Sequence, residues 1–439
     1  MKSFFSNFWE TLRGSYWFVP SLMTMGAILL SYALLALDQR LNFSSLKGYA
    51  WIYAGSATGA RSVLSTVASS VITVAGTTFS ITIATLSLAS SQFGPRLLRG
   101  FLRDTGNQIV LGTFIGTFVY CLLILRTIRG EQTDVFVPNF SVTCGVFLAL
   151  ASVGVLIYFI NHVSASIQAS HVIASVTGEL NEAIDRLYPA TLGEGEGDPT
   201  LSEQDARALP SQAIDAECSG YVQTIDADRV MALARAAGGF LEIRRRPGAF
   251  ATQGSPLALL YADPPLPKDF CRDLNKAFVL GPSRTMAYDA GFGIDQLVEV
   301  AARALSPGIN DPFTAMSCLN RLGEALSRLA ARPVPSSCRY HEGVLRLIAR
   351  PLTFPEMVSS AFDQIRQYGS TSFAVTVHLL ETLEVVAART DGEVNREALR
   401  RQARLIHDGS RALSEPEDRQ TVSARYDHTM RHLSGAGRK

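Results

Sequence analysis

Four long apolar stretches within the first 178 residues constrain this chain more than any other feature of its sequence. A helix needs about 20 mostly apolar residues to cross the hydrocarbon layer of a bilayer. The stretches fall at about 16–37, 62–91, 107–125 and 137–160. They predict a transmembrane domain over residues 1–189, in which short connections make neighbouring helices antiparallel, and they exclude a wholly soluble enzyme.

The first stretch carries no charge from Gly14 to Leu37, which is longer than the apolar core of about 7–15 residues in a cleaved signal peptide. We therefore expect an uncleaved anchor. The short loops carry five cations on each side of the membrane, so the positive-inside rule does not decide the orientation. The basic segment RLLRGFLR lies on the side of the termini and favours cytoplasmic termini. Six cysteines without a CxxC pair fit a reducing compartment and indicate neither a zinc site nor a disulfide framework.

The second stretch is unusual because 14 of its 30 residues from Ser62 to Ser91 are Ser or Thr. At helical spacing, many of these hydroxyls fall on one continuous stripe. The hydroxyl stripe consists of Ser62, Thr66, Ser69, Thr73, Thr77, Ser80, Ser87 and Ser91. Thirty helical residues extend about 45 Å, against roughly 30 Å of hydrocarbon, so this helix must tilt, project beyond the bilayer or break near Gly76.

Two interpretations of the hydroxyl stripe are open. Small residues and hydroxyls allow close packing of helices inside a bundle. Alternatively, the hydroxyls face water in a pore, where they replace part of the hydration shell of an ion. A narrow stripe from one chain cannot enclose water, so a pore requires several copies of the chain around an axis.

The Gly94-Pro95 pair predicts the end of the second helix. Three arginines follow it. Arg96, Arg99 and Arg103 are spaced like one face of a helix. They either anchor the protein to lipid headgroups or form a positive ring at the mouth of an oligomeric pore.

The fourth stretch keeps its helical period to Pro189, which predicts one long helix that carries a soluble domain. A linker rich in Gly and acidic residues is expected at 190–212, and a small β-barrel or sandwich unit at 213–288. A helical domain is expected at 289–439. Its helices are predicted at about 313–331, 339–349, 356–366, 371–390 and 395–413. The fold class is thus an α-helical membrane domain of four transmembrane helices plus an α+β soluble domain.

The sequence shows no GxSxG elbow, no HExxH, no Walker loop and no GxGxxG followed by an acid. The best catalytic candidates are Arg284, Asp289, Asn310 and Asp311. Structural roles are favoured for all four. Arg284 and Asp289 could form a buried ion pair, and Asn310 and Asp311 could cap a helix. Seven histidines are scattered without ligand spacing. We expect no enzyme, no cofactor and no metal, and a formal charge of +1 gives no reason to expect nucleic acid as a partner.

Three segments carry a resemblance to a known family: SSQFGPRLLRGFLRD, FINHVSASIQ and AARALSPGINDPFTA. They resemble the bacterial membrane family called domain of unknown function 2254, and the resemblance covers nearly the whole chain. It implies four spans plus a cytoplasmic domain in an inner membrane. The layout is also similar to that of oligomeric four-helix channels with a polar second helix and a cytoplasmic vestibule, such as the bestrophins.

The leading hypothesis is a homo-oligomeric inner-membrane ion channel or pore lined by the hydroxyl stripe, with a pentamer as the working stoichiometry. Its partners are then the lipid bilayer, further copies of itself and ions. The alternative is a membrane-anchored sensor or scaffold whose soluble domain binds a ligand or a protein.

Overall fold

The computed structural model describes residues 17–40, 55–94, 104–131, 134–166, 168–189, 210–262 and 269–434. The chain divides into two compact units, Met1–His171 and Val172–Lys439.

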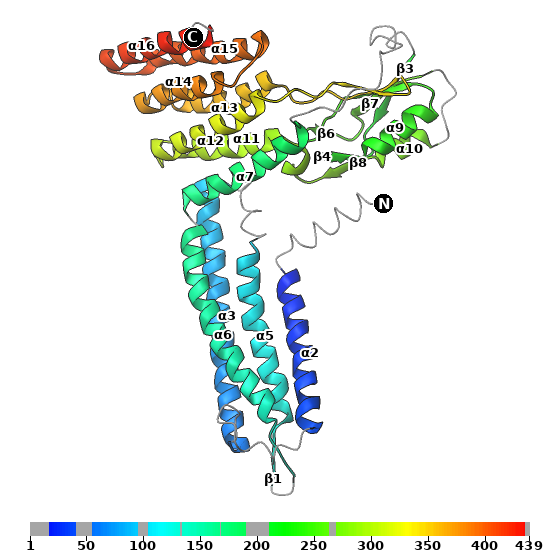
Figure 1. Ribbon diagram of the computed structural model, residues 1–439, viewed down its shortest axis with the longest axis vertical. Helices are drawn as coiled ribbons and strands as arrows, with labels where there is room; N and C mark the ends of the chain where they lie inside the picture. Colours follow the sequence, from blue (N-terminus) through cyan, green and yellow to red (C-terminus); the bar gives the residue numbers. More distant parts are fainter. Residues whose placement is uncertain are drawn as a thin grey trace. The chain divides into compact units, whose positions relative to one another are not determined.

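The first unit, called the membrane unit below, contains four long helices (Figure 1). They are α2 (Phe18–Arg40), α3 (Ala57–Phe93), α5 (Thr105–Thr127) and α6 (Asn139–Ser166). All four are long and apolar enough to cross a membrane, which confirms the four predicted spans. Helix α5 contacts each of the other three helices. A hairpin of β1 (Arg129–Glu131) and β2 (Asp134–Phe136) joins α5 to α6.

Helix α3 runs without interruption through Gly76, so the expected alternative of a break at that residue is wrong. Its 37 residues correspond to about 55 Å of helix. The helix therefore tilts or projects beyond the hydrocarbon layer. It ends at Phe93 before the predicted Gly-Pro pair, and Gly94 follows as the C-cap with a φ of 107°, which favours a residue without a side chain.

Two charged side chains hold the ends of neighbouring helices in this unit. Asp38 of α2 is 7% exposed and accepts hydrogen bonds from the Phe140 amide (3.1 Å), the Ser141 amide (3.0 Å) and the Ser141 hydroxyl (2.6 Å) at the N-terminus of α6. Arg61 of α3 donates to the Ile128 carbonyl, 2.7 Å away, at the C-terminus of α5. Each charge has the sign that the helix dipole favours at that end.

Replacing Asp38 with alanine is expected to lower the free energy of unfolding of the membrane unit by about 2–3 kcal/mol, because buried amides at a helix N-terminus lose their acceptor. Thermal unfolding of the purified chain in detergent, followed by tryptophan fluorescence, measures the change. The signal has no contribution from a tryptophan of the second unit, because all three tryptophans of the chain come before residue 52.

The serine partner provides the control for this prediction. Ser141→Ala should cost less than Asp38→Ala, and the double variant should be about as stable as Asp38→Ala because the two side chains share one interaction. Fully additive losses would contradict the assigned cap.

The predicted continuous helix from the fourth span to Pro189 is divided in the structure. Helix α6 ends at Ser166 and α7 covers Ala169–Leu187, and the boundary between the two units falls at His171. The side chains of α6 are apolar around most of its circumference, whereas α7 buries a single stripe in the second unit. The buried stripe of α7 consists of Val172, Ile173, Val176, Thr177, Leu180, Ala183 and Ile184. The two helices share one apolar period in the sequence, although α6 is apolar around most of its circumference and α7 has a single apolar face. The period alone therefore did not show where one helix ends and the next begins.

The β-rich part of the second unit contains two open sheets. The strands are β3 (Ser211–Asp215), β4 (Gly220–Ile225), β5 (Phe240–Ile243), β6 (Phe250–Ala251), β7 (Pro256–Tyr261), β8 (Phe278–Gly281), β9 (Cys338–His341) and β10 (Val344–Ile348). One sheet has the order β3-β7-β5-β10-β9 and the other has the order β6-β4-β8. The described strands therefore form no closed barrel, and the mixed α+β class is confirmed. Most of the expected linker lies outside the described residues, and β3 begins at Ser211.

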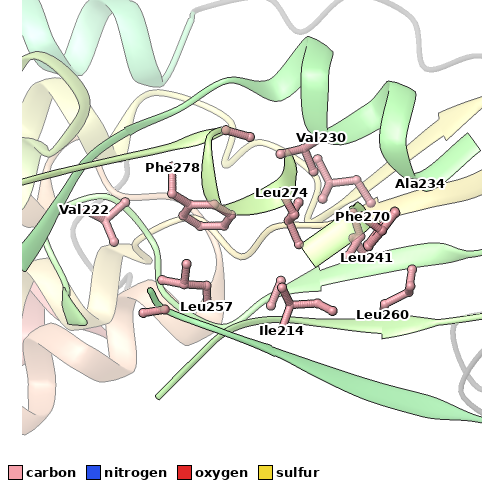
Figure 2. Close-up of a cluster of buried hydrophobic side chains, with 14 of the residues drawn as sticks. Ile214, Val222, Val230, Ala234, Leu241, Leu257, Leu260, Phe270, Leu274 and Phe278 are labelled. Carbon is pink, nitrogen blue, oxygen red and sulfur yellow. The ribbon is translucent and has the colours of Figure 1, made fainter. Parts of the chain in front are cut away.

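A common hydrophobic core joins both sheets to α9 (Ala227–Ala236) and α10 (Phe270–Asn275). Figure 2 shows Leu241 and Leu257 of the larger sheet, Val222 and Phe278 of the smaller sheet and Val230 of α9 in this core.

The helix predicted at 339–349 is wrong, because these residues belong to the hairpin of β9 and β10. Glu342 and Gly343 both have positive φ, 53° and 75°, as a tight hairpin turn of the primed type requires. Strand β10 then pairs in parallel with β5, about one hundred residues earlier in the chain.

Helices build the remainder of the second unit. They are α11 (Ala290–Ala304), α12 (Pro312–Ala330), α13 (Phe354–Tyr368), α14 (Phe373–Ala387), α15 (Glu393–Gly409) and α16 (Pro416–Leu433), with 3₁₀ turns η3 (Met286–Tyr288) and η4 (Ser410–Ala412). The other four predicted helices correspond to α12, α13, α14 and α15.

Candidate functional site

The hydroxyl stripe lies on the exposed side of α3. All eight of its Ser and Thr residues are exposed in the structure. The buried residues of the same helix are Ala60, Leu64, Ala68, Val71, Ala75, Thr78, Ala89 and Phe93. At about 100° per residue, the stripe and this buried face are centred on opposite sides of the helix.

Mostly apolar residues, rather than the hydroxyls of the stripe, make the contact between α3 and its neighbours. Ala60, Leu64 and Ala68 lie in one buried cluster with Tyr120 of α5 and Val142 of α6. The alanines allow close approach of the helices. Packing inside the chain's own bundle, one of the two open interpretations, therefore does not explain the stripe.

Five of the eight hydroxyls of the stripe donate to backbone carbonyls of α3 itself. Thr66, Thr73 and Ser80 donate to the carbonyls four residues earlier, at 2.8, 2.8 and 2.9 Å. Thr77 does the same at 3.1 Å, and Ser91 donates to the Leu88 carbonyl at 2.8 Å. A hydroxyl has one donor and two acceptor lone pairs, so such a side chain presents acceptor oxygen to its surroundings.

Apolar side chains border the hydroxyl stripe on both sides. Ile72 and Ile83 lie on one flank, and Ile81 and Leu88 lie on the other, each at least 40% exposed. The three arginines predicted to follow α3, Arg96, Arg99 and Arg103, lie outside the described residues.

The structure brings Arg284 and Asp289 together in the second unit. The Arg284 Nε lies 2.8 Å from Asp289 Oδ2, and its Nη1 lies 2.5 Å from Asp295 Oδ2. Burial raises the pKa of the Asp289 carboxyl, which is only 8% exposed, while Arg284 opposes that rise. Burial also acts against the charged guanidinium, but Asp289 and Asp295 outweigh it and raise the pKa of Arg284.

A turn of the β-rich part closes over this ion pair. Gly248 has a φ of 88°, and a Cβ at this position would overlap Asp289 Oδ2. The neighbouring Arg246 pairs with Glu356 of α13 at 3.1 Å. The arrangement joins the β-rich and helical parts of the unit, as a structural ion pair does.

Asn310 and Asp311 lie beyond the other end of α11, whose 15 residues span about 22 Å. Asn310 has a positive φ of 51°, a conformation that asparagine tolerates better than most residues. Asp311 caps α12 by accepting from the Thr314 amide (3.1 Å) and hydroxyl (2.6 Å), and the Thr314 hydroxyl bond lowers its pKa. The four candidates thus form two separate structural motifs.

Sequence reasoning missed a polar cluster at one end of the membrane unit. His162 Nε2 of α6 lies 2.5 Å from Asp104 Oδ2, and Asp104 also caps α5 by accepting from the Gly106 amide. A Cβ at Gly106 would lie 2.8 Å from His162 Nε2 and 2.9 Å from the Tyr158 hydroxyl, so only glycine fits beneath this cluster. The expected antiparallel order of α5 and α6 could have predicted this cluster, because it places Asp104 at the start of α5 beside His162 near the end of α6.

Among the residues that the structure describes, no group of three His, Cys, Asp or Glu side chains could hold a metal ion. The candidate features that the structure describes are the exposed hydroxyls of α3 and the ion pair of Arg284 with Asp289.

Comparison with known proteins agrees with this architecture. The family model "Predicted membrane protein (DUF2254)" matches residues 13–385. Two proteins named as uncharacterized, from Mycobacterium bovis and Mycobacterium tuberculosis, are each 34% identical over 379 residues, which cover 84% of this chain and 72% of theirs. No solved structure matches the chain. On the extent of these matches, the chain belongs to the DUF2254 family of predicted membrane proteins.

Proposed function

We propose that the chain forms a homo-oligomeric ion channel or pore in the bacterial inner membrane, lined by the hydroxyl stripe of α3. In this assembly the termini are cytoplasmic and the second units form a vestibule. A pentamer is the working stoichiometry, taken from the layout of other four-helix channels. The proposal assigns no catalytic role to the soluble part.

One observation carries the proposal: the hydroxyl stripe faces away from the chain's own bundle. Hydrocarbon gives no favourable partner to the outer lone pairs of hydroxyls, whereas water or a permeating ion does. Several α3 helices around an axis would turn their stripes inward. The flanking side chains, such as Ile72 and Ile81, would then seal the contacts between copies.

The direction of hydroxyl donation supports cations over anions as permeating species. Because Thr73 and Thr77 donate to their own helix, their outer faces are acceptors. Oxygen acceptors replace the water around a cation, as backbone carbonyl oxygens do in K⁺-selective filters.

The same hydrogen bonds also favour a second candidate, a membrane-anchored sensor or scaffold. A hydroxyl that donates to its own helix has its donor satisfied and is tolerated next to lipid. In this case the stripe would lie dry against lipid or another protein, and the soluble part would carry the function by binding a ligand or a protein.

Access of water to the stripe separates the two candidates. Single cysteines at Ser69, Thr73 and Ser80 are treated with a charged, water-soluble thiol reagent in liposomes, and modification is read by peptide mass spectrometry. The exposed native Cys218 and Cys271 are first replaced with serine.

Two further cysteines calibrate the measurement. Leu150 of α6 is 63% exposed and serves as a lipid-facing position, and Ala68 of α3 serves as a buried one. The pore predicts that the stripe cysteines react much faster than a cysteine at Leu150. Equal and slow reaction at all positions of a folded protein would exclude a wetted stripe.

A further inference from the structure

Three helical hairpins are stacked in the second unit: α11 with α12, α13 with α14, and α15 with α16 (Figure 1). Contacts between the second helices of these hairpins advance in the same direction along both partners, so α12, α14 and α16 run parallel. The contacting pairs are Asn320–His378 and Gly323–Thr382 between α12 and α14, and Glu381–Arg425 and Glu384–His428 between α14 and α16. The turns inside the three hairpins therefore lie at one end of the stack, called the turn end below.

Exposed apolar side chains at the turn end decrease from the first hairpin to the third. In the first turn, Phe313 is 74% exposed and Ile309 is 45% exposed. The second hairpin has Tyr368, at the end of α13, which is 57% exposed. The third turn, residues 408–417, is described throughout and exposes no large apolar side chain, because its Leu413 is buried. An apolar patch thus covers the part of the turn end formed by the first two hairpins.

The first turn holds its apolar side chains in a fixed arrangement. The amides of Ile309 and Asn310 both donate to the Ser306 carbonyl, at 3.0 and 2.9 Å. Asp311 caps the helix that begins next, so the backbone is also fixed just before Phe313. Side chains presented on a rigid turn lose little conformational entropy when a partner covers them.

Helix α7 relates the turn end to the path of the chain. Two pairs along α7 and α12, one turn apart on both helices, show that these helices run parallel. The pairs are Asn181–Glu324 and Asp185–Arg328. Ala169 and Pro312, where the two helices begin, each lie twelve residues before the first pair, so α7 begins at the turn end. Val172, the first residue of the second unit, follows the fourth span (Asn139–Ala165) by seven residues. The second unit is therefore attached to the membrane at its turn end.

We propose that the turn end binds the surface of the lipid bilayer, with Phe313 and Ile309 in the headgroup layer and Tyr368 at the margin of the contact. Aromatic side chains favour this level of the membrane, and exposed apolar patches on a soluble part commonly mark a binding surface. The decrease in apolar exposure favours a membrane over a second copy of the chain. The hairpin beside α7, which is nearest to the attachment, is the most apolar, and the third hairpin is polar. The contact does not depend on the proposed pore.

Spin labels on the full chain in liposomes test the proposal. The exposed native Cys218 and Cys271 are first replaced with serine, and a nitroxide is attached in the variant Phe313→Cys. Power saturation then compares the collisions of the label with oxygen, which concentrates in lipid, and with a water-soluble nickel chelate. We expect the ratio of oxygen to nickel collisions to be several-fold higher at 313 than at a label in water.

Val394→Cys supplies the matched label in water. Val394 is 75% exposed, as Phe313 is, but it lies at the start of α15, which follows the end of α14 and is therefore at the opposite end of the stack. A second membrane-facing label at Ile309 is placed in a chain that keeps Phe313. Loss of the phenyl ring then cannot account for a negative result.

Two results would overturn the proposal. Labels at 309 and 313 that collide with the nickel chelate as often as the label at 394 would place the turn end in water. Labels that are shielded from both reagents and broaden one another's spectra would show that a second copy of the chain, rather than lipid, covers the turn end.

Discussion

A leucine in place of Thr77 is expected to reduce the flux of K⁺ into liposomes that contain the full chain by at least about tenfold, which corresponds to about 1.4 kcal/mol added to the barrier. Thr77 lies near the middle of the hydroxyl stripe, and its hydroxyl donates to the Thr73 carbonyl. Leucine removes the outward acceptor oxygen and adds apolar volume at the same point. A permeating ion then loses water without gaining a substitute.

Thr82→Leu is the matched control for this experiment. Thr82 makes the same hydrogen bond within α3, to the Thr78 carbonyl at 2.9 Å, but it is half-buried and lies on the opposite side of the helix from the stripe. Its variant should conduct like the parent chain. Flux that is unaffected by Thr77→Leu, or lowered equally by both substitutions in folded protein, would contradict a pore lined by the stripe.

The membrane unit could be predicted closely because its signals are local. Each span is apolar over a length that admits few alternatives in water. The alignment of the hydroxyls on one face also follows from helical geometry alone. Which face is buried does not follow, because a membrane helix can turn either small apolar or small polar residues toward its neighbours. Only the contact of Ala60, Leu64 and Ala68 with α5 and α6 decides it.

The hairpin at 338–348 was missed for a different physical reason. Its apolar residues Leu345, Leu347 and Ile348 are compatible with either period over so short a run. The Glu342-Gly343 turn was the local signal, but the parallel partner strand β5 lies about one hundred residues away. The sequence around β10 does not show that this strand pairs with β5, because the two strands are far apart along the chain.

Contacts between the ends of the membrane helices were not predicted for the same reason, because the contacting residues are far apart in sequence. Asp38 has the appearance of a residue at the water boundary, yet it is buried against the start of α6. His162 and Asp104 are 58 residues apart in sequence and in hydrogen-bond contact in the structure. Such pairs become predictable only once the antiparallel order of the helices is combined with the position of each helix end.

Replacing Arg284 with methionine is expected to destabilise the second unit by about 3–5 kcal/mol, because Asp289 is left as a buried carboxylate without its counter-charge. The guanidinium carbon of Arg284 also lies 5.1 Å from the centre of the Phe292 ring, and methionine gives up that cation–π contact. Hydrogen exchange of peptides from α11 measures the loss. The second unit contains no tryptophan, so fluorescence would not report it.

The pH dependence of this loss has a definite sign. Without Arg284, burial alone raises the pKa of Asp289 above its value in the unfolded chain. The native variant then holds a proton that the unfolded chain releases, so the contribution of Asp289 to its stability is fully present below about pH 4 and is lost as the pH rises through the native pKa. The deficit relative to the parent chain should therefore grow from acid to neutral pH. Arg272→Met, which breaks an exposed pair with Asp269, should leave exchange in α11 unchanged at every pH. A deficit for Arg284→Met that stays constant with pH would mean that lost packing, rather than the unpaired carboxylate, accounts for it.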